Sequence, residues 1–575
     1  MCTPSWSDGG LPPAVVDTLG ARTLRETVHE VAANRGTLNF RPDEIQAVAK
    51  ALMTTRIPLH RLANALREAG ADVDETLEYV YHLLNYWQED RSPTHLDNTR
   101  RFVTLFGNDV RFCPALGWLV WDGLRWSKDD VGRIDFLAKQ VSASRRADGA
   151  LVGQARMFAK TDDDKVRLFG IAESLFAAAR RAESKAQLEA IVALAKSEPG
   201  IAVRVDELDA DPWLLNALNG TVELRTGTLR PHNREDLITK VVPEEYDPNA
   251  HFATWDRFLE QLTGGDQSLQ GYLQRAAGYS ITGDTGEEVL FFVHGPGGSG
   301  KSTFIEALRS SLGDYAKTAD FETFVKKRGD GGIRNDIARL MGARMVSSIE
   351  VDEGKELAQG LVKTITGGDM VAARLLYKEY MEFKPDFKLW LVANDAPEVD
   401  ADDDGMWRRI QVIPLVHALP REKRKMWVKE LLTNPEIAGP AILAWAVKGC
   451  QMWQRDGLGT APAVQQATVE YRQSMDVVGR FLDECCILNP SHFTPNVDLY
   501  GAYRDWALEN GEVPVLTQKA LAPRLKKKGL SNNKKNKGQR GWWGLGLKTS
   551  GIIGQWDRQA SNTSTRPALP VGRIP

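Results

Sequence analysis

The segment with the clearest chemical capability is GPGGSGKST, residues 295–303. An apolar run from Val289 to Val293 precedes it, and apolar residues at helical spacing follow it. In such a segment, glycines let backbone N–H groups close around phosphate oxygens, a lysine reaches the β- and γ-phosphates, and a serine hydroxyl binds Mg²⁺. The sequence therefore predicts a strand, an ATP-binding phosphate loop, and a helix from Thr303 to Leu312 that ends at Gly313.

The position of each residue in this loop predicts its role. We expect Lys301 to contact the outer phosphates and Ser302 to bind Mg²⁺ at the N-terminus of the helix. A flexible glycine-rich linker is the alternative interpretation, and the flanking strand and helix argue against it. The predicted ATP contacts are Gly295, Pro296, Gly297, Gly298, Ser299, Gly300, Lys301, Ser302 and Thr303.

Three acidic residues follow a second apolar run, Met345 to Ile349. A phosphate-loop enzyme needs a carboxylate at the end of a neighbouring strand, where it holds the metal and activates water. We favour Glu350 for this role, with Asp352 and Glu353 as contenders, and we expect Glu350 and Asp352 to bind Mg²⁺ together with the serine. Alternatively, one of the three caps a helix that starts near Lys355.

A third apolar run, Lys388 to Ala393, ends in Asn394. An amide side chain at the end of a core strand can position the attacking water against the γ-phosphate. Asparagine before a turn is also common for purely structural reasons. Asn394 is therefore a candidate catalytic residue whose weight depends on its neighbours.

A possible DNA contact lies between the acidic segment and this strand. Residues 369–376 and 380–385 alternate like two strands around Tyr377-Lys378-Glu379. A lysine at a hairpin tip meets backbone phosphate and a tyrosine stacks on bases, which suits contact with a strand of any sequence. We predict DNA contacts by Tyr377 and Lys378, with Lys363 and Arg374 as further contributors. An ordinary surface hairpin is the alternative.

The C-terminal part of the chain carries a local basic stripe. No acidic residue occurs between Val513 and Gln555. The pattern predicts a helix that ends at Gly529, then a basic turn and a strand, which is typical of a winged helix, and Trp542-Trp543 flank the stripe. A solvated charged surface is the alternative. The predicted DNA contacts here are Lys526, Lys527, Lys528, Lys534, Lys535 and Arg540.

The elements that position these residues predict a multidomain α/β protein. Residues 1–92 show helical spacing, and 93–250 mix helices with hairpins at 118–126 and 216–233. Apolar strands alternate with helices in 255–428, as in nucleotide-binding domains. Residues 455–548 form the winged-helix-like domain, and we expect 549–575, which are polar with several Pro and Ser/Thr, to be disordered.

Composition bounds the class of protein. The chain has 575 residues, 42% apolar and 26% charged, with a net charge of −3, so any surface for nucleic acid must be local. Five cysteines without a CxxC pair indicate a reduced, cytoplasmic setting. The sequence shows no signal-peptide pattern and no stretch long enough to span a membrane, so we expect a soluble protein without a membrane partner.

The order of these segments resembles the superfamily 3 helicases, and most closely the phage and plasmid primase–helicase type. The phosphate loop, the acidic strand, LVKTITGGDMVAARLLYKEYMEFKPDFKLWLVANDAP and DGMWRRIQVIPL carry the resemblance, which covers roughly residues 95–548. It implies an AAA+-type ATPase core that assembles into a hexameric ring. Such a ring encircles single- or double-stranded DNA and moves 3′ to 5′ with ATP hydrolysis during phage, plasmid or viral replication.

The resemblance also implies roles for the matching residues. Gly295, Gly300, Lys301 and Ser302 match Walker A, Glu350 with Asp352 or Glu353 matches Walker B, and Asn394 matches the sensor asparagine. Residues 363–384 match the motif that holds the DNA-contacting hairpin. If the protein is phage-encoded, the expected compartment is the cytoplasm of a bacterial host.

The stretch DADDDG, residues 400–405, begins like a calcium-binding EF-hand loop. That loop needs a glutamate at position 12 and helices on both sides, whereas position 12 is Gln411 and a strand precedes the stretch. We therefore predict an acidic connector between Asn394 and Arg408-Arg409. In a ring, one of these arginines is expected to reach the neighbouring ATP site. Ion pairs with the same aspartates are the alternative.

The N-terminal region departs from the pattern of fused primase–helicases. Residues 1–92 are too short for a polymerase-like or Toprim-type primase and show no D-x-D…H constellation. We therefore expect no primase activity in this chain, and a separate primase is a candidate partner. The alternatives to a helicase are an ATP-dependent DNA-binding replication initiator and a bifunctional primase–helicase.

Overall fold

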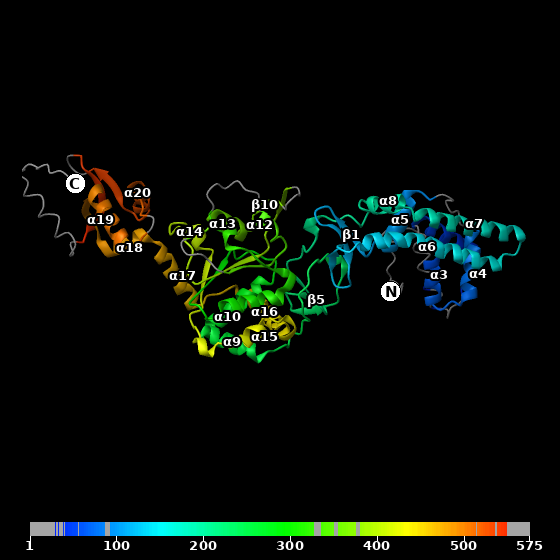
Figure 1. The fold of residues 1–575 in the computed structure, drawn as a ribbon, viewed down its shortest axis with the longest axis horizontal. Coiled ribbons are helices and arrows are strands. Elements are labelled where there is room, and N and C mark those ends of the chain that lie inside the picture. The colour runs from blue at the N-terminus through cyan, green and yellow to red at the C-terminus, as the bar shows by residue number, and fades with distance from the viewer. Residues whose placement is uncertain are drawn as a thin grey trace, which may run out of the picture.

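The computed structural model describes residues 29, 33, 38, 41–55, 57–86, 93–326, 335–349, 355–374, 380–512, 515–534 and 538–548. These residues form three units in a row, with helices at one end, a sheet with helices on both sides in the centre, and a small α/β unit at the other end (Figure 1). The predicted tail, 549–575, lies outside the described residues.

The N-terminal unit packs helices around a long antiparallel pair, α6 and α7 (Figure 1). Pro58 separates the first two helices, and Asp72 and Thr94 each begin a helix with a capping box. The described part of residues 1–92 is helical, as predicted. The bounds are α2 (Pro42–Thr55), α3 (Leu59–Glu68), α4 (Val73–Leu84), α5 (His95–Phe106), α6 (Arg133–Ala155), α7 (Asp162–Ala182) and α8 (Lys185–Ala195).

A buried charge network joins three of these helices. Asp148 of α6 accepts hydrogen bonds from the backbone N–H of His60, at 2.9 Å, and from the guanidinium of Arg101. Its carboxylate also pairs with the imidazole of His60, at 2.6 Å. Burial acts to raise the pKa of Asp148, but Arg101 and His60 outweigh it and lower the pKa to about 2. Asp148 is therefore a charged anchor between α3, α5 and α6.

Two small antiparallel sheets connect this unit to the centre. The first contains β1 (Val110–Cys113), β2 (Gly117–Trp121) and β3 (Trp126–Lys128), and the second contains β4 (Leu214–Ala217), β5 (Gly220–Glu223) and β6 (Thr228–Arg230). The pairing of β2 with β3 and of β5 with β6 confirms both predicted hairpins.

The central unit is built on a parallel five-stranded sheet in the order β13-β7-β12-β9-β8. All six residues of β12 are buried, and five of them pair with β7. Both faces of the strand therefore lie in the core. This arrangement confirms a mixed α/β fold with a parallel sheet. The strands are β7 (Leu290–His294), β8 (Ala316–Thr318), β9 (Met345–Ile349), β12 (Lys388–Ala393) and β13 (Ile410–Pro414).

Helices cover both faces of this sheet (Figure 1). One core cluster joins Phe291 and Trp390 to α10, α11 and α16, and a second joins Phe292 and Leu391 to α13 and α17. The opposite placement of Phe291 and Phe292 reflects the two-residue period of a strand. The bounds are α9 (Ala253–Thr263), α10 (Gln267–Ser280), α11 (Lys301–Leu312), α12 (Asn335–Ala338), α13 (Gln359–Thr366), α14 (Asp404–Trp407), α15 (Met426–Leu432), α16 (Pro435–Asp456) and α17 (Pro462–Met475).

Two predicted helix starts were wrong. The helix after the phosphate loop begins at Lys301, two residues before Thr303. The helix after the acidic segment, α13, begins at Gln359 and not near Lys355. The backbone at Lys355–Leu357 is extended there, because it exchanges hydrogen bonds with Glu398 on one side and with Lys326 on the other.

The predicted two-stranded hairpin is present. β10 (Val371–Arg374) pairs antiparallel with β11 (Tyr380–Phe383), with Arg374 opposite Tyr380 at the end next to the tip. Its tip, residues 375–379, lies outside the described residues.

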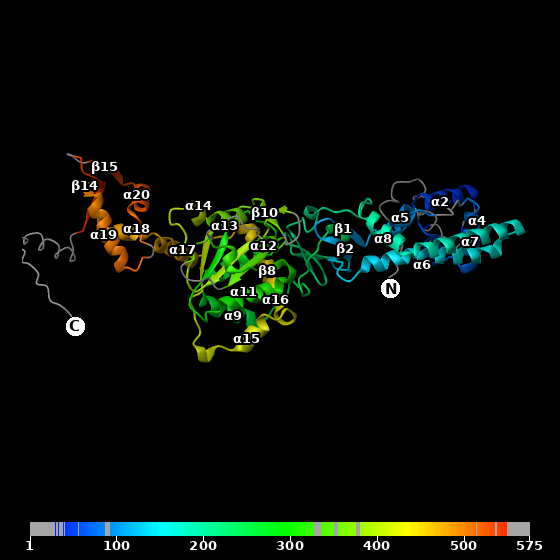
Figure 2. The same ribbon diagram turned by 45° about the horizontal axis from the view of Figure 1, so that its top comes forward.

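The C-terminal unit packs three helices against a three-stranded antiparallel sheet in the order β14-β16-β15. In Figure 2, α17 leads from the central unit into it. The elements are α18 (Val477–Cys485), β14 (Cys486–Pro495), α19 (Asn496–Glu509), α20 (Gln518–Lys527), β15 (Ser531–Lys534) and β16 (Arg540–Leu547). The predicted strand after the basic turn is β16. The two strands that flank it were not predicted.

None of the helices in the described residues combines the length and the apolar character needed to cross a membrane.

Candidate nucleotide site and nucleic-acid surfaces

The predicted phosphate loop joins the carboxyl end of β7 to the start of α11, at the edge of the sheet where ligands of parallel α/β folds bind. Two of its positions require glycine. A Cβ atom on Gly295 would lie 2.1 Å from the carbonyl oxygen of Leu415, and Gly300 has a φ of 95° against Leu262 and Phe258. The backbone can therefore follow this path only with glycine at both positions.

Lys301 lies inside the loop and contacts a second predicted residue. Its side chain is 6% exposed, and its Nζ donates hydrogen bonds to the carbonyl oxygens of Gly295, at 2.6 Å, and Pro296, at 2.9 Å. A third hydrogen bond, of 3.0 Å, runs to Oδ1 of Asn394. Burial lowers the pKa of Lys301. The structure thus brings the predicted phosphate lysine and the predicted sensor asparagine together.

The strand register explains this meeting. Ala393 at the end of β12 pairs with His294 at the end of β7, so the next residue of each strand, Asn394 and Gly295, leaves the sheet at the same level. β9 also ends at this edge, since Ile349 pairs with Val392. Glu350, Asp352 and Glu353 follow it but lie outside the described residues, so their metal-binding and catalytic roles stay predictions.

Two further polar side chains adjoin the loop. Ser299 is buried, and its Oγ has no hydrogen-bond partner within the described residues. A buried hydroxyl without a partner in a glycine-rich loop fits a phosphate ligand, which would satisfy it. Ser302 and Thr303 are half-buried in the first turn of α11, and Ser302 has the position predicted for the Mg²⁺ ligand.

His294 is a neighbour of the loop that the sequence prediction missed. Burial lowers the pKa of its imidazole, while contact with the backbone of Asn394 acts against this shift. It occupies the same position on β7 that Ala393 occupies on β12, directly before the loop. A polar residue at the end of an otherwise apolar run was the signal that could have found it.

The tandem arginines have different surroundings. Arg409 donates to Oγ1 of Thr366, at 3.2 Å, to the carbonyl of Gly405, at 2.9 Å, and to Glu288, at 2.5 Å, and its side chain is 14% exposed. Arg408 is exposed, and its guanidinium has no ion pair within the described residues. Arg409 is therefore engaged inside its own chain, whereas Arg408 projects from it.

The acidic connector, residues 400–405, pairs with other cations. Asp403 binds Lys363 at 2.8 Å, Asp404 pairs with Arg472 of α17, and Asp402 lies 3.5 Å from Lys527 of α20. The alternative of a cluster between these aspartates and the tandem arginines does not occur among the described ion pairs. The described residues also contain no group of three or more His, Cys, Asp or Glu that could hold a metal.

The predicted DNA contacts of the hairpin are only partly described. The Nζ of Lys363 rests on Asp403, the backbone of Arg374 belongs to β10, and Tyr377 and Lys378 lie outside the described residues. These four contacts stay predictions.

In the described part of the basic stripe, some cations are held in ion pairs and others are not. Lys526, Lys534 and Arg540 are exposed, and the last two face each other across β15 and β16. Lys528 pairs with Asp476. Lys527 lies close to Asp402 of the acidic connector. Lys535 lies outside the described residues.

The two tryptophans that flank the stripe differ in how far they are exposed. Trp542 is 3% exposed and belongs to the core of the C-terminal unit. Trp543 is half-buried, and its ring lies 5.1 Å from that of Phe493. The strand therefore directs Trp542 into the core, and of the two rings only that of Trp543 is partly exposed beside the stripe.

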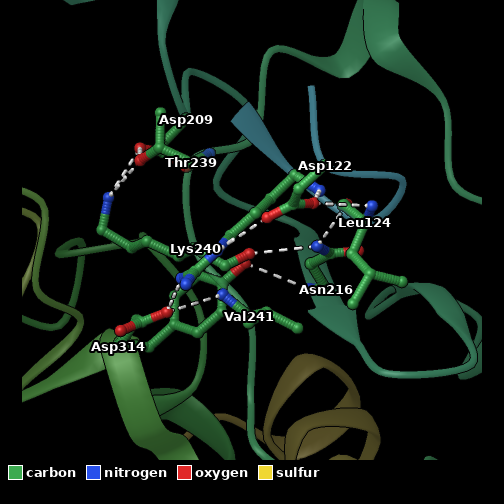
Figure 3. A network of polar contacts seen from close by, with 10 residues as sticks. Asp122, Leu124, Asp209, Asn216, Thr239, Lys240, Val241 and Asp314 are labelled. Carbon is green, nitrogen blue, oxygen red and sulfur yellow. Dashed lines mark hydrogen bonds and ion pairs between the residues drawn. The ribbon is translucent and has the colours of Figure 1, made fainter. Parts of the chain in front are cut away.

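A cleft of about 1110 Å³ lies at the opposite edge of the sheet, between the residues that precede β7, β9 and β12 and the 93–250 unit. Several charged residues of its walls are paired within the chain (Figure 3). Lys240 binds Asp209 at 2.6 Å, and Asp314 pairs with Arg125 and accepts from the backbone N–H of Val241 at 3.2 Å. The contacts of Asp314 join the central unit to the 93–250 unit, whereas the Lys240–Asp209 pair lies within the 93–250 unit.

Two buried cations lie at the same edge of the sheet. Arg344 donates to the carbonyl oxygens of Ile281, Asp211 and Leu214, at 2.9, 3.2 and 2.8 Å. Lys388, at the start of β12, donates to three further carbonyls, and burial lowers its pKa to about 7. Arg344 thus fastens the base of the sheet to the 93–250 unit through the carbonyls of Asp211 and Leu214, whereas the acceptors of Lys388 belong to the central unit itself.

Three segments of the chain match protein-family models. Residues 99–264 match "D5 N terminal like", residues 293–409 match a family of unknown function, DUF5906, and residues 473–542 match "Poxvirus D5 protein-like". The first segment runs from α5 to the end of α9. The second runs from the end of β7 through the phosphate loop to the residue before β13, and the third covers most of the C-terminal unit.

Several curated relatives come from large DNA viruses. A "Putative helicase" of Acanthamoeba polyphaga mimivirus is 30% identical over 53% of this chain and 34% of its own length. A "Putative helicase" of Frog virus 3 is 26% identical over 43% of this chain and 27% of its own length. A "Putative primase" of African swine fever virus is 22% identical over 52% of this chain and 34% of its own length. The matched part spans about a third of these relatives.

Among solved structures, the apo structure of the NrS-1 C terminal region in its A form is similar to this chain. The TM-score is 0.41 with 15% sequence identity, over 63% of this chain and 91% of that one. The family models thus match three separate segments of the chain, and these viral relatives are similar to it over about half of its length.

Proposed function

We propose that this chain is an ATP-dependent DNA helicase of viral or mobile-element replication, with an AAA+-type core that assembles into a ring, most simply a hexamer. The observation that carries the proposal is the meeting of Lys301 and Asn394 above a glycine-rich loop, at the carboxyl edge of a parallel sheet. The D5-type segment matches and the helicase names of the viral relatives support the same activity.

In this proposal, the phosphate loop binds ATP through residues 295–303. The Nζ of Lys301 exchanges the carbonyls of Gly295 and Pro296 for the outer phosphate oxygens, which are stronger acceptors because they are charged. Ser302 and the acidic residues after β9 would hold Mg²⁺, which would supply positive charge against the phosphates. Asn394 orients the attacking water from the end of β12.

The tandem arginines divide their work between stability and catalysis. Arg409 is bound to Thr366, Gly405 and Glu288 of its own chain and cannot leave without breaking those contacts. Arg408 is exposed, so it is the residue we propose to reach the ATP of the neighbouring subunit. There its charge would stabilise the transition state.

Two surfaces contact DNA in this proposal. The β10–β11 hairpin, with Tyr377 and Lys378 at its tip, tracks a strand through the ring. The C-terminal unit is winged-helix-like, and the exposed Lys526, Lys534 and Arg540 supply phosphate contacts to single- or double-stranded DNA.

Strand displacement tests the proposal. The full chain is incubated with ATP, Mg²⁺ and a forked duplex, beside Lys301→Ala and beside Lys196→Ala as a charge-matched control on the surface of the N-terminal unit. We expect the wild type and the control to displace the strand. Lys301→Ala should neither hydrolyse ATP nor displace the strand. ATP hydrolysis without displacement would contradict the helicase and favour an initiator that uses ATP for assembly.

The name "Putative primase" of one viral relative points to a second activity, and the same preparation tests it. A single-stranded template and NTPs report primer synthesis directly. We expect no primer from this chain, and a template-dependent product would instead identify a bifunctional primase–helicase.

A further inference from the structure

The chain returns to the phosphate loop after β13. Residues 415–424, here the crossing segment, run from the end of β13 toward α15 and pass directly over the loop. The backbone N–H of Leu415 donates to the carbonyl of His294, at 2.8 Å, and that of Leu419 donates to the carbonyl of Gly298, at 3.2 Å. The crossing segment is therefore fixed to the start and to the middle of the glycine run.

The crossing segment ends in an arginine that lies on the loop. Nε of Arg424 donates to the carbonyl of Leu419, at 2.8 Å, and Nη2 donates to the carbonyl of Gly297, at 3.3 Å. A Cβ atom on Gly298 would lie 2.0 Å from the same Nη2. The guanidinium thus rests against the middle of the loop, in contact with Gly297 and Gly298.

The partners of Arg424 are weak for a guanidinium. The side chain is exposed, and the contacts recorded for it within the described residues are two neutral carbonyls and no carboxylate. A guanidinium offers five N–H donors in a planar fork that matches two phosphate oxygens, and such charged pairs are roughly twice as strong as neutral hydrogen bonds. A phosphate held by the loop would therefore draw Arg424 away from Gly297.

The elements on either side keep Arg424 near the loop. The crossing segment fixes its N-terminal side, and α15 begins two residues after it. Lys429 of α15 pairs with Glu306 of α11 at 2.8 Å, so α15 is tied to the helix that starts at Lys301. Arg424 can exchange a carbonyl for a nearby phosphate through side-chain rotation alone.

We propose that Arg424 contacts the outer phosphates of the nucleotide bound by its own chain, as a second phosphate-binding cation opposite Lys301. This inference rests on the proposed ATP site and adds to it a residue 127 positions from Gly297 in the sequence. It makes the crossing segment part of the site, and it distinguishes Arg424, which acts in its own chain, from Arg408, which is proposed to act on the neighbour.

Arg421 offers a matched control. It is an exposed arginine of the same crossing segment, three residues before Arg424, and no side-chain contact joins it to the loop in the described residues. Arg421→Ala removes the same charge from the same segment. Arg424→Lys keeps the charge of Arg424 but removes the planar fork.

The test is equilibrium binding of fluorescent ATP and ADP analogues, with Mg²⁺, to the full chain and to its Arg424→Ala, Arg424→Lys, Arg421→Ala and Lys301→Ala variants. We expect Arg424→Ala to weaken ATP binding about tenfold or more. ADP binding should weaken less, because ADP has one phosphate fewer to contact. Arg424→Lys should recover part of the loss, and Arg421→Ala should bind like the wild type.

The outcomes separate this inference from the function beneath it. If Arg424→Ala binds ATP as tightly as Arg421→Ala while Lys301→Ala has lost binding, the nucleotide site stands and the role of Arg424 is overturned. If the wild type shows no binding that Lys301→Ala removes, the nucleotide site itself fails and this inference fails with it. Because the side chain is exposed, thermal melting of the Arg424 variants should match that of Arg421→Ala.

Discussion

The ammonium group of Lys301 lies 3.0 Å from the side-chain oxygen of Asn394, although 93 positions separate the two residues in the sequence. The contact joins the ends of two neighbouring parallel strands, and its donor is a lysine whose other partners are loop carbonyls. An amide that touches the cation proposed to bind phosphate is placed to respond if that cation moves to a ligand.

Replacement of these two residues should separate binding from hydrolysis. Lys301→Ala should remove ATP binding, because the loop loses the cation that meets the phosphates. Asn394→Ala should keep binding within a few fold and lower kcat roughly 10²-fold, since a mispositioned water costs about this much. Nucleotide titration and steady-state ATPase assays measure the two effects. Equal loss of binding in both variants would contradict a positioning role for Asn394.

The two arginines should differ in what their removal damages. Arg409→Ala should lower the free energy of unfolding by roughly 1–3 kcal/mol, because it breaks hydrogen bonds of a charged group. Arg408→Ala should leave thermal melting unchanged and lower ATP hydrolysis by about 10³, the scale of an arginine supplied to a neighbouring site.

Mixed assemblies test whether Arg408 acts on the neighbour. A mixture of Arg408→Ala and Lys301→Ala chains contains interfaces at which one subunit supplies the loop and the other the arginine. Such a mixture should hydrolyse ATP faster than either variant alone. Activity no higher than that of the separate variants would argue that Arg408 acts within its own chain or not at all.

Glu244 should make stability depend on pH. It is 3% exposed between α11 and α16, its Oε2 has no partner within the described residues, and burial raises its pKa from 4.5 to about 8. Below pH 4.5 both the folded and the unfolded state hold the proton. As pH rises toward 8, the unfolded chain releases it first, so the folded state loses stability across this window.

Glu244→Gln removes this effect and keeps the shape of the side chain. We expect the variant to melt at a slightly higher temperature than the wild type at pH 5 and at a clearly higher one at pH 8. At pH 8 its free energy of unfolding should be larger by on the order of a few kcal/mol. Glu245→Gln removes the same charge at an exposed neighbour and should change neither value. A constant difference at both pH values would show that Glu244 is not protonated in the folded state.

The exposed cations of the C-terminal unit should set its affinity for DNA. The triple change Lys526→Ala, Lys534→Ala and Arg540→Ala should weaken binding to duplexes of any sequence and lower the slope of log affinity against log salt by about one per lost contact. Lys528→Ala should have a smaller effect, because Lys528 pairs with Asp476. Fluorescence anisotropy over a salt series measures both, and an unchanged slope for the triple variant would exclude these contacts.

Much of the central fold could be predicted from local sequence, because each of its core strands is a short apolar run. The ends of β7, β9 and β12 fall within one residue of the predicted ones. Lys301 and Asn394 could be placed in one site, since parallel strands present their carboxyl ends at one edge. The start of α13 could not, because the backbone before it pairs with Glu398, a contact that local spacing does not encode.

Other parts of the site depend on distant contacts. Arg424 has no motif around it and reaches the loop only because β13 lies beside β7 and returns the chain across the glycine run. The different roles of Arg408 and Arg409 come from Glu288 and Thr366, which are not adjacent to them in the sequence. The burial of Trp542 could not be predicted from the sequence, because the register of β16 decides which of its faces is buried.

The joint between the central and C-terminal units is a single residue. Asp476 ends α17 and begins α18, its carboxylate accepts the N–H of Gly479 at 2.8 Å, and it also pairs with Lys528. α17 itself is seated on the sheet, since Thr468 accepts from the backbone N–H of Val412 and the hydroxyl of Tyr471 donates to the carbonyl of Pro397.

A flexible tether would let the basic face sample a wide volume, with an effective concentration set by tether length. Here α17 and α18 are joined through Asp476 alone. This short joint gives the basic face a nearly fixed orientation relative to the strand edge that carries Asn394. DNA held by the C-terminal unit would therefore meet the rest of the chain from one direction, and a glycine–serine insertion after Asp476 would replace that fixed approach with a random search.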